Sequence, residues 1–349
     1  MPAPDNQAVS SQTITVHNPL ADRAASVLTK LITDGDTLCD YLELDKAQFD
    51  KVYHLPVSFA LKVPYTFAAK MRKGDINDPL LQQVLPSFRE LSVHPDFSTD
   101  PLAERAHNPV QGLLHKYQNR VLITLTGACA VHCRYCFRQH FDYQSNLPKK
   151  AELSRIAHYI NNDKKINEII LSGGDPLNIS NRRLRQYLQA FENTHVTTIR
   201  LHTRLPIVLP ERIDDELCEL LQASSKKIVL VVHTNHPNEL GRDTKDALKR
   251  LAQAQVTLLN QSVLLKGIND DVDTLVALSH KLFAMGVLPY YLHMLDKVQG
   301  AEHFLVEEAT AVTLYWQLLA RLSGYLVPKL VQELPHKPYK TPVNLYANA

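Results

Sequence analysis

Beyond about residue 120 the sequence alternates between strand-like and helix-like runs, and this alternation constrains the fold more than any other feature. The strand-like runs are 121–126, 169–172, 197–202, 228–233, 256–265 and 287–292. Helix-like runs lie between them, such as the one with Leu184, Leu188 and Phe191, and a long run at 307–322 follows. Strands followed by helices of about 10–15 residues are typical of βαβ units and a parallel sheet. The sequence therefore predicts an α/β fold, a partial (β/α)6 TIM-like barrel, with its chemistry at the C-terminal ends of the strands.

The barrel is expected to carry an extension at each end. We expect three parts: 1–100, an N-terminal tail and helical region; 101–324, the barrel; and 325–349, a C-terminal strand followed by a further segment. Leu28, Leu31 and Ile32 follow helical spacing, and "DTLCDYLEL" carries a second such stripe. The stretch "HPDFSTDPLAERAHNPVQG" has three prolines and few periodic apolar residues, which predicts a linker.

Composition excludes several classes of protein. The net charge of the 349 residues is +2, so bulk electrostatics predict neither a nucleic-acid nor a membrane partner. No apolar run reaches the roughly 18 residues of a membrane span, and the N-terminus lacks the basic start and apolar core of a signal peptide. Five cysteines, three of them clustered, argue against a disulfide framework and for a reducing compartment. We therefore expect a cytoplasmic protein.

The clustered cysteines are Cys129, Cys133 and Cys136, spaced C-x3-C-x2-C directly after the first barrel strand. One interpretation is a zinc site, with His132 or a distant residue as the fourth ligand. The other is a [4Fe–4S] cluster, which normally takes four thiolates. With three thiolates one iron keeps an open position, and an open position is what a catalytic metal needs.

A second candidate site ends the next strand, in "IILSGGDPL". Gly173 and Gly174 permit close approach of a ligand to the backbone, and Asp175 after them can accept from an ammonium group. The same residue types are also those of an ordinary turn at the end of a strand.

Longer stretches of the chain resemble a known family. "LTGACAVHCRYCFR", "LSGGDPL", "TRLPIVLPERI", "TNHPNEL", "LLNQSVLLKGINDD", "PYYLHMLDKVQGAEHF" and "KTPV" resemble, in order, segments of the lysine 2,3-aminomutases, which are radical S-adenosylmethionine (SAM) enzymes. The N-terminal "VPYTFAAKMRKGDINDPLLQQVL" resembles the branch of that family that serves translation elongation factor P. In that branch a partner lysyl-ligase attaches (R)-β-lysine to the factor.

The resemblance implies three cofactors: a [4Fe–4S] cluster on the three cysteines, SAM, and pyridoxal 5′-phosphate (PLP) held by Lys340 as a Schiff base. It implies an isomerase, a lysine 2,3-aminomutase that converts L-α-lysine to (R)-β-lysine. The reaction is a 1,2-amino shift started by a 5′-deoxyadenosyl radical and assisted by PLP. It also implies a reductant such as flavodoxin or ferredoxin.

The resemblance further implies the substrate contacts. Arg138 corresponds to the arginine that pairs with the substrate carboxylate, a task that suits a planar guanidinium. Asp296 and Glu333 correspond to two acidic residues that bind the ε-ammonium group. The free-lysine enzymes have aspartate at the second position, so Glu333 is a departure from their pattern.

The remaining cofactor contacts also follow from the resemblance. Ser172, Gly173, Gly174 and Asp175 correspond to the contact with the amino group of SAM. Arg120 corresponds to a cofactor-binding arginine, although a salt bridge at the edge of a strand is equally consistent with the sequence. His233 and Gln261 correspond to positions that face SAM, and buried, satisfied polar residues are the alternative. The free-lysine enzymes bind a structural zinc through C-terminal cysteines, whereas this chain has no cysteine after Cys218, so we expect no such zinc.

Three functions are consistent with these residues. The first is a lysine 2,3-aminomutase that supplies β-lysine for elongation factor P. The second is a free-amino-acid 2,3-aminomutase acting on lysine or glutamate; the acidic pair favours a cationic substrate over glutamate. The third is a zinc-bearing binding module without enzymatic activity.

Overall fold

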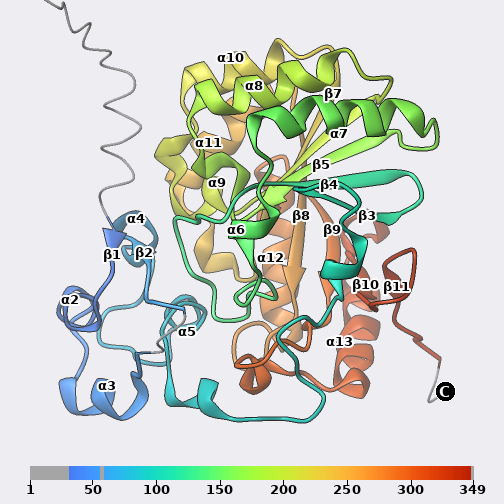
Figure 1. Cartoon of the computed structure of the whole chain (residues 1–349). Helices are drawn as coiled ribbons and strands as arrows, with labels where there is room; N and C mark the ends of the chain where they lie inside the picture. Colours follow the sequence, from blue (N-terminus) through green and yellow to red (C-terminus); the bar gives the residue numbers. More distant parts are fainter. Residues whose placement is uncertain (1–30, 56–58, 347–349) are drawn as a thin grey trace, which may run out of the picture.

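A computed structural model describes residues 31–55 and 59–346 of the chain. Its centre is a nine-stranded curved sheet in the order β11-β10-β9-β8-β7-β6-β5-β4-β3 (Figure 1). Strands β4 to β10 are parallel to one another, while β3 and β11 run antiparallel at the two edges. The sheet is therefore an open, partial barrel, as the alternation of strand and helix patterns predicts.

Six parallel strands match the six runs expected from the sequence. They are β4 (Arg120–Thr126), β5 (Glu168–Gly173), β6 (Thr198–Thr203), β7 (Lys227–His233), β8 (Thr257–Val263) and β9 (Leu288–His293). β10 (Lys329–Gln332) is the expected C-terminal strand, and β11 (Thr341–Pro342) returns beside it. β3 (Leu113–Tyr117) has no counterpart among the expected strands.

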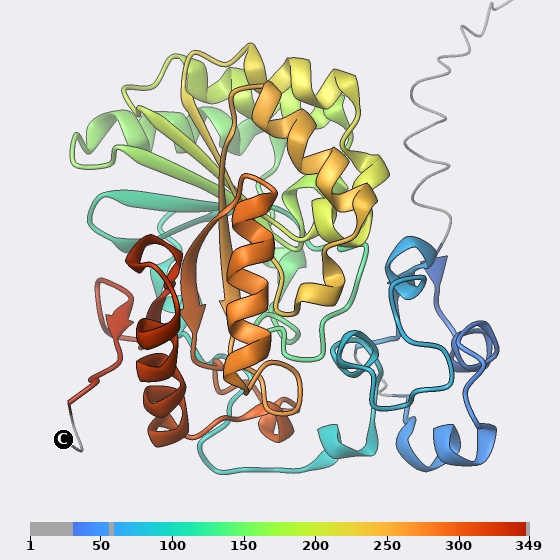
Figure 2. The same ribbon diagram turned by 180° about the vertical axis from the view of Figure 1, so that it is seen from behind.

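Helices cover the convex face of this sheet (Figure 2). The barrel helices are α6 (Tyr143–Asn146), α7 (Lys150–Asn162), α8 (Asn181–Glu192), α9 (Leu205–Val208), α10 (Asp215–Gln222), α11 (Arg242–Gln253), α12 (Val272–Ala284) and α13 (Glu308–Arg321). Several begin at an aspartate or serine whose side chain accepts from a backbone amide one turn on, for example Asp214 before α10 and Asp271 before α12. These caps satisfy backbone amides in the first turn of each helix, so they fix where the helix begins after its loop.

The N-terminal region consists of short elements beside the barrel (Figure 1). They are β1 (Leu31–Ile32), α2 (Gly35–Tyr41), α3 (Lys46–Val52), β2 (Val63–Pro64), α4 (Tyr65–Ala68) and α5 (Pro79–Gln82). The expected helix across "DTLCDYLEL" is α2. The expected helix through Leu31 and Ile32 is wrong, because both pair with β2 as a strand; Leu28 and the expected N-terminal tail lie outside the described residues.

A continuous apolar core joins the N-terminal region to the barrel. Phe67 and Leu81 of the first region belong to the same buried cluster as Leu205 and Leu230 of the second. Lys70 adds polar contacts across the boundary, donating to the carbonyl oxygen of Ile207 at 2.9 Å. Within residues 31–55 and 59–346, no helix combines the length and apolar character needed to traverse a bilayer.

Candidate active site

One cavity of about 400 Å³ runs along the barrel strands, from the first residues of β4 and β5 to the residues that follow their C-terminal ends. Every site residue expected from the sequence lines it: Arg120, Cys129, Cys133, Cys136, Arg138, Ser172, Gly173, Gly174, Asp175, His233, Gln261, Asp296, Glu333 and Lys340. The cysteines belong to a loop that follows β4, whereas the last three residues follow β9 and β10. The fold therefore brings the two groups of residues to one enclosure.

Burial disfavours the thiolate form of two of the three cysteines, Cys129 and Cys136. Burial raises the pKa of Cys136 to about 12, and the neighbouring Cys133 adds to that rise. Burial also raises the pKa of Cys129 well above its ordinary value. A bound cation reverses this preference because it stabilises the thiolate form. The loop therefore fits a group that brings its own positive charge.

A zinc ion and a [4Fe–4S] cluster make different demands on the three thiols. Among residues 31–55 and 59–346, no three His, Cys, Asp or Glu side chains converge on a point where one metal ion could bind. In a [4Fe–4S] cluster each thiolate binds a different iron, so its ligands stand farther apart than those of one zinc ion. His132 does not complete a zinc site either: its Nδ1 lies 2.7 Å from the carbonyl oxygen of Ala60, and its ring stacks on Phe59.

The two glycines at the end of β5 are required by the cysteine loop itself. A Cβ atom on Gly173, whose φ is +119°, would lie 2.6 Å from the carbonyl oxygen of Thr126. A Cβ atom on Gly174 would lie 2.6 Å from the carbonyl oxygen of Ala128. Side chains at these positions would push the beginning of the cysteine loop away from β5. The glycines thus set the position of the cysteines as well as lining the cavity.

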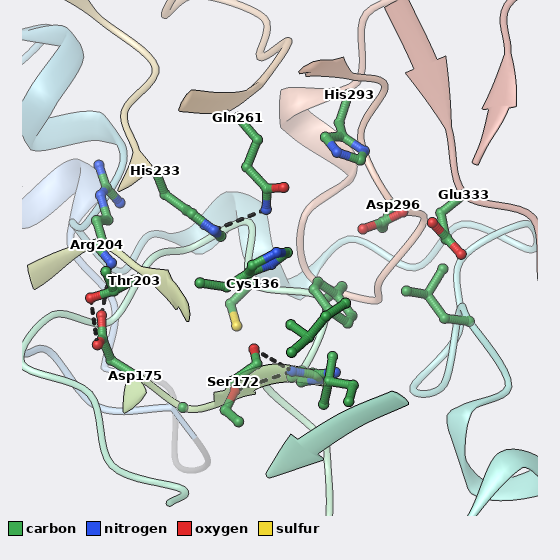
Figure 3. A pocket seen from close by; sticks show the side chains of 18 of the residues that line it. Cys136, Ser172, Asp175, Thr203, Arg204, His233, Gln261, His293, Asp296 and Glu333 are labelled. Atoms are coloured by element: carbon green, nitrogen blue, oxygen red, sulfur yellow. Dashed lines mark hydrogen bonds between the residues drawn. The ribbon is translucent and has the colours of Figure 1, made fainter. Parts of the chain in front are cut away.

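Asp175 has its carboxylate oxygens occupied by the chain. Oδ1 accepts from Thr203 Oγ1 at 2.7 Å and from the amide of Leu177 at 3.0 Å. Oδ2 accepts from the amide of Arg204 at 2.8 Å. This side chain ties the end of β5 to the end of β6 (Figure 3). The contact with an amino group that the sequence predicts for Asp175 stays a prediction, and any such contact would share these oxygens.

Arg138 is buried and already paired. Its Nε and Nη2 donate to the two carboxylate oxygens of Glu104, at 2.8 and 2.6 Å. Its Nη1 donates to Ser172 Oγ at 3.2 Å and to the carbonyl oxygen of Gly173 at 3.3 Å. Burial opposes the charged form, but Glu104 outweighs burial and raises the pKa of Arg138. A substrate carboxylate would therefore meet a guanidinium whose bidentate edge faces Glu104.

The other end of the cavity is rich in charge. Glu333 accepts from Lys116 Nζ at 2.8 Å, from Lys340 Nζ at 3.0 Å and from the hydroxyl of Tyr117. Burial favours the protonated carboxyl, but Lys340, Lys116 and Tyr117 outweigh it and hold the pKa of Glu333 below its usual value. Glu333 is therefore an ionised group with three partners.

Asp296 differs from Glu333 although the two carboxylates lie side by side in Figure 3. Burial raises the pKa of Asp296 to about 7; Lys340 opposes that rise, and Glu333 and Glu104 add to it. No described donor bonds to its side chain in the way that Lys116 bonds to Glu333. Asp296 is thus the carboxylate that gains most from a cationic ligand.

Three further expected residues also line the cavity. His233 Nε2 and Gln261 Nε2 are 2.9 Å apart on adjacent strands (Figure 3). Burial lowers the pKa of His233 to about 3, with the charges of Arg204, Lys340 and Arg138 adding to the effect. The guanidinium of Arg120 lies 3.9 Å from the ring centre of Tyr117 and donates to Asn119. Within the part of the chain that the structure describes, Arg120 forms no salt bridge at the strand edge.

Sequence reasoning missed several lining residues. They are Glu104, Lys116, Tyr117, Arg200, His202, Arg204 and His293. His202 and His293 each have a buried Nε2 without a protein partner, which marks them as groups that can bond to a ligand. Each sits at the C-terminal end of a parallel strand, and a polar residue at that position was the available signal.

Comparisons with known proteins agree with the geometry. A model of the Radical SAM superfamily matches residues 123–278, which include the three cysteines. The chain is 46% identical to the L-lysine 2,3-aminomutase of Haemophilus influenzae over 92% of this chain and 95% of that protein. It is 45% identical to the Escherichia coli protein of the same name, over 95% of this chain and 97% of that one. The Clostridium subterminale protein of that name is 35% identical, over 88% of this chain and 74% of its own length.

Proposed function

Because this chain belongs to the lysine 2,3-aminomutase family of radical SAM enzymes, we propose that it converts L-α-lysine to (R)-β-lysine. One observation carries the proposal. A single cavity joins three cysteines at one end to Lys340, Asp296 and Glu333 at the other. Radical generation and recognition of a cationic amino acid can therefore take place within one enclosure.

The family works with a [4Fe–4S] cluster, SAM and PLP, and the residues present fit each group. Cys129, Cys133 and Cys136 would hold the cluster. Lys340, whose amine reaches the cavity, would hold PLP. When bound, these groups supply a hydrogen-abstracting radical and a conjugated carbonyl that carries the migrating nitrogen. The protein must bind, orient and shield the reacting atoms.

Glu333 helps to keep Lys340 ready for this task. Its Oε2 is 3.0 Å from Lys340 Nζ, and its Oε1 is held by Lys116 and Tyr117. The carboxylate therefore orients the amine of Lys340, which would hold PLP.

Asp296 is the residue that we propose for the ε-ammonium group of lysine. Its carboxyl is buried with a pKa raised to about 7, so an ammonium partner stabilises its ionised form. Glu333, which is already bonded to two lysines, contributes less. Lysine is preferred over glutamate because a carboxylate tail would face two acidic side chains here.

Arg138 would bind the substrate carboxylate only by sharing its guanidinium with Glu104. The pair carries no net charge, so this contact depends on sharing N–H groups that already bond to Glu104, Ser172 and Gly173 rather than on charge alone. We expect Arg138 to orient the carboxylate rather than to supply most of the binding free energy.

We further propose that the β-lysine produced is attached to elongation factor P by a partner ligase. The support is the resemblance of the N-terminal residues to that branch of the family. The near full-length match with the H. influenzae and E. coli proteins, against 74% of the longer Clostridium protein, is consistent with it.

Anaerobic reconstitution tests the reaction. The whole chain is loaded with iron, sulfide and PLP, then given SAM, a reductant and either L-lysine or L-glutamate, with chiral analysis of the products. We expect 5′-deoxyadenosine and (R)-β-lysine from lysine only. Absence of both products from an iron-loaded protein would refute the proposal. β-Glutamate as the main product would show that glutamate, and not lysine, is the substrate.

The link to elongation factor P has its own test. The factor is purified from cells that lack this gene, with and without (R)-β-lysine in the medium, and its intact mass is measured. We expect loss of the β-lysyl mass and its return with added β-lysine. An unchanged mass in the deletion strain would assign the β-lysine to another use.

A further inference from the structure

One buried arginine contacts the cysteine loop but is absent from the proposed reaction. Arg204, directly after β6, is 6% exposed, and its Nη1 lies 2.7 Å from the sulfur of Cys133. Neither Cys129 nor Cys136 has a charged donor at hydrogen-bonding distance among the described residues. Of the three thiols, Cys133 is thus the one that the described residues supply with a charged hydrogen-bond donor.

The guanidinium is held in place from two sides. Its Nη2 donates to Glu239 Oε2 at 3.0 Å and to Gln83 Oε1 at 2.7 Å. Its Nη1 also donates to the hydroxyl of Tyr135 at 2.8 Å. The backbone amide of Arg204 is fixed by Asp175. The side chain therefore cannot turn away from the sulfur without breaking several buried bonds.

Glu239 is itself anchored, so the pair acts as an oriented dipole. It is 0% exposed, and its Oε1 accepts from the amides of Asn235 and His236 and from Gln83 Nε2. It bonds to Nη2 of Arg204, whereas the sulfur of Cys133 lies at Nη1. The positive end of the ion pair points at the sulfur, inside a poorly solvated environment where such a field is only weakly screened.

Gln83 gives the N-terminal region a part in this arrangement. Its side-chain amide bonds to both Arg204 and Glu239. Its backbone carbonyl oxygen accepts from the backbone amide of Arg134, in the cysteine loop, at 2.9 Å. Arg134 is itself fully buried and paired with Glu90. The N-terminal region thus forms the outer wall of the cysteine site.

We propose that Arg204 is a tuning and positioning residue, whose N–H bond to the Cys133 sulfur raises the reduction potential of the cluster. A one-electron reduction adds negative charge that is shared with the thiolates, and a charged donor stabilises that form. The electron that cleaves SAM then enters more readily. The inference rests on the proposed placement of the cluster, which the iron content of the parent protein tests separately.

The first test is a redox titration of Arg204→Lys, followed by electron paramagnetic resonance of the reduced cluster without SAM. Lysine keeps the charge that Glu239 needs, but one ammonium cannot reproduce the fork that spans Glu239 and Cys133. We expect the iron content of the parent and a midpoint potential shifted to a more negative value. Full iron with an unchanged potential overturns the proposal.

Arg212→Lys is the matched control. Arg212 is an equally buried arginine, bonded to the carbonyl oxygens of Leu177 and Ile179, and it does not line the cavity. Its replacement removes comparable hydrogen bonds without touching a cysteine, so its potential should equal that of the parent. An equal shift in this control would assign the effect to general loosening and overturn the proposal.

Glu239→Gln supplies an independent variant with the opposite expectation. It removes the negative charge behind Arg204 and leaves Arg204 beside the sulfur, so the potential should shift to a less negative value. If the Arg204→Lys protein fails to bind iron, the reduction potential of Glu239→Gln tests the proposal in its place. Loss of iron from both variants in proteins that still melt cooperatively would show a purely structural contact and would also overturn the proposal.

Discussion

The two ends of the cavity are built in different ways. The cysteine end comes from one short loop, residues 129–136, and burial raises the pKa of its Cys129 and Cys136 thiols. The lysine end gathers Lys116, Asp296, Glu333 and Lys340 from segments far apart in the chain, and it is dense in charge. The cysteine end is prepared for a cofactor that brings positive charge. At the lysine end, the charges of the lysines and of Glu333 are paired with one another before any ligand binds.

The largest expected effect follows from breaking the cysteine end. Cys133→Ala should lose most cluster iron and all turnover, because a cluster with two remaining ligands is not retained. Iron analysis and 5′-deoxyadenosine formation measure this. Cys218→Ala is the control, since that thiol is half-buried on α10 away from the cavity and its loss should leave iron unchanged. Turnover by Cys133→Ala would contradict a radical mechanism.

The next effect separates the two ends. Lys340→Ala should keep the parent iron content but lose the absorbance of PLP bound to the protein, because its amine is the proposed attachment point. A visible spectrum after PLP loading and desalting measures it. Lys337→Ala, three residues away and exposed, should keep that absorbance. Persistence of the absorbance in Lys340→Ala would identify another lysine as the anchor.

A smaller effect sharpens the contrast between the two acidic residues. Asp296→Asn should raise the KM for lysine about 10- to 100-fold, the loss expected for one charge-assisted hydrogen bond. Glu333→Gln should change KM less and slow PLP attachment more, because Glu333 holds Lys340. Steady-state kinetics and the rate of PLP incorporation distinguish the two. Equal KM effects would show that both carboxylates bind the ammonium group.

The smallest effect is one of pH. The pKa of Asp296 is raised to about 7, so its carboxyl becomes charged as the pH rises through that value. We expect kcat/KM for lysine to rise between about pH 6 and 8, and this rise should be absent in Asp296→Asn. The same substitution should stabilise the fold above pH 7, because a buried group with a raised pKa destabilises the folded protein once ionised. Unchanged melting at pH 8 would count against that raised pKa.

Local patterns explain why much of the fold and the cysteine end could be predicted. The apolar runs ending at Thr126, His233 and Leu292 mark their strands to within a residue or two. The spacing of the cysteines is visible in eight residues. In both cases the chemistry depends on neighbours in the sequence, so a single stretch carries the information.

The residues that the sequence analysis missed owe their roles to contacts with distant parts of the chain. Lys116 and Tyr117 lie on β3, a short edge strand with only two buried residues and a weak apolar pattern. Glu104 lies in a proline-rich stretch that reads as a linker, yet it bonds to Arg138. Arg204 lies in a motif that supports the family resemblance, but its contact with Cys133 arises only when β6 and the β4 loop meet. Tertiary packing, which no local pattern contains, decides each of these roles.

Lys116 and Glu333 also determine how the barrel is joined. Strands β3 and β10 lie toward opposite edges of the open sheet, and the bond between these two side chains crosses the gap between those edges. This seam consists of bonds from side chains rather than of a strand ladder, so it can part without unpairing any two strands. The wall of the enclosure nearest to Lys340 is therefore closed by side chains, and a ligand ammonium that competes for Glu333 acts on the same bonds that close it.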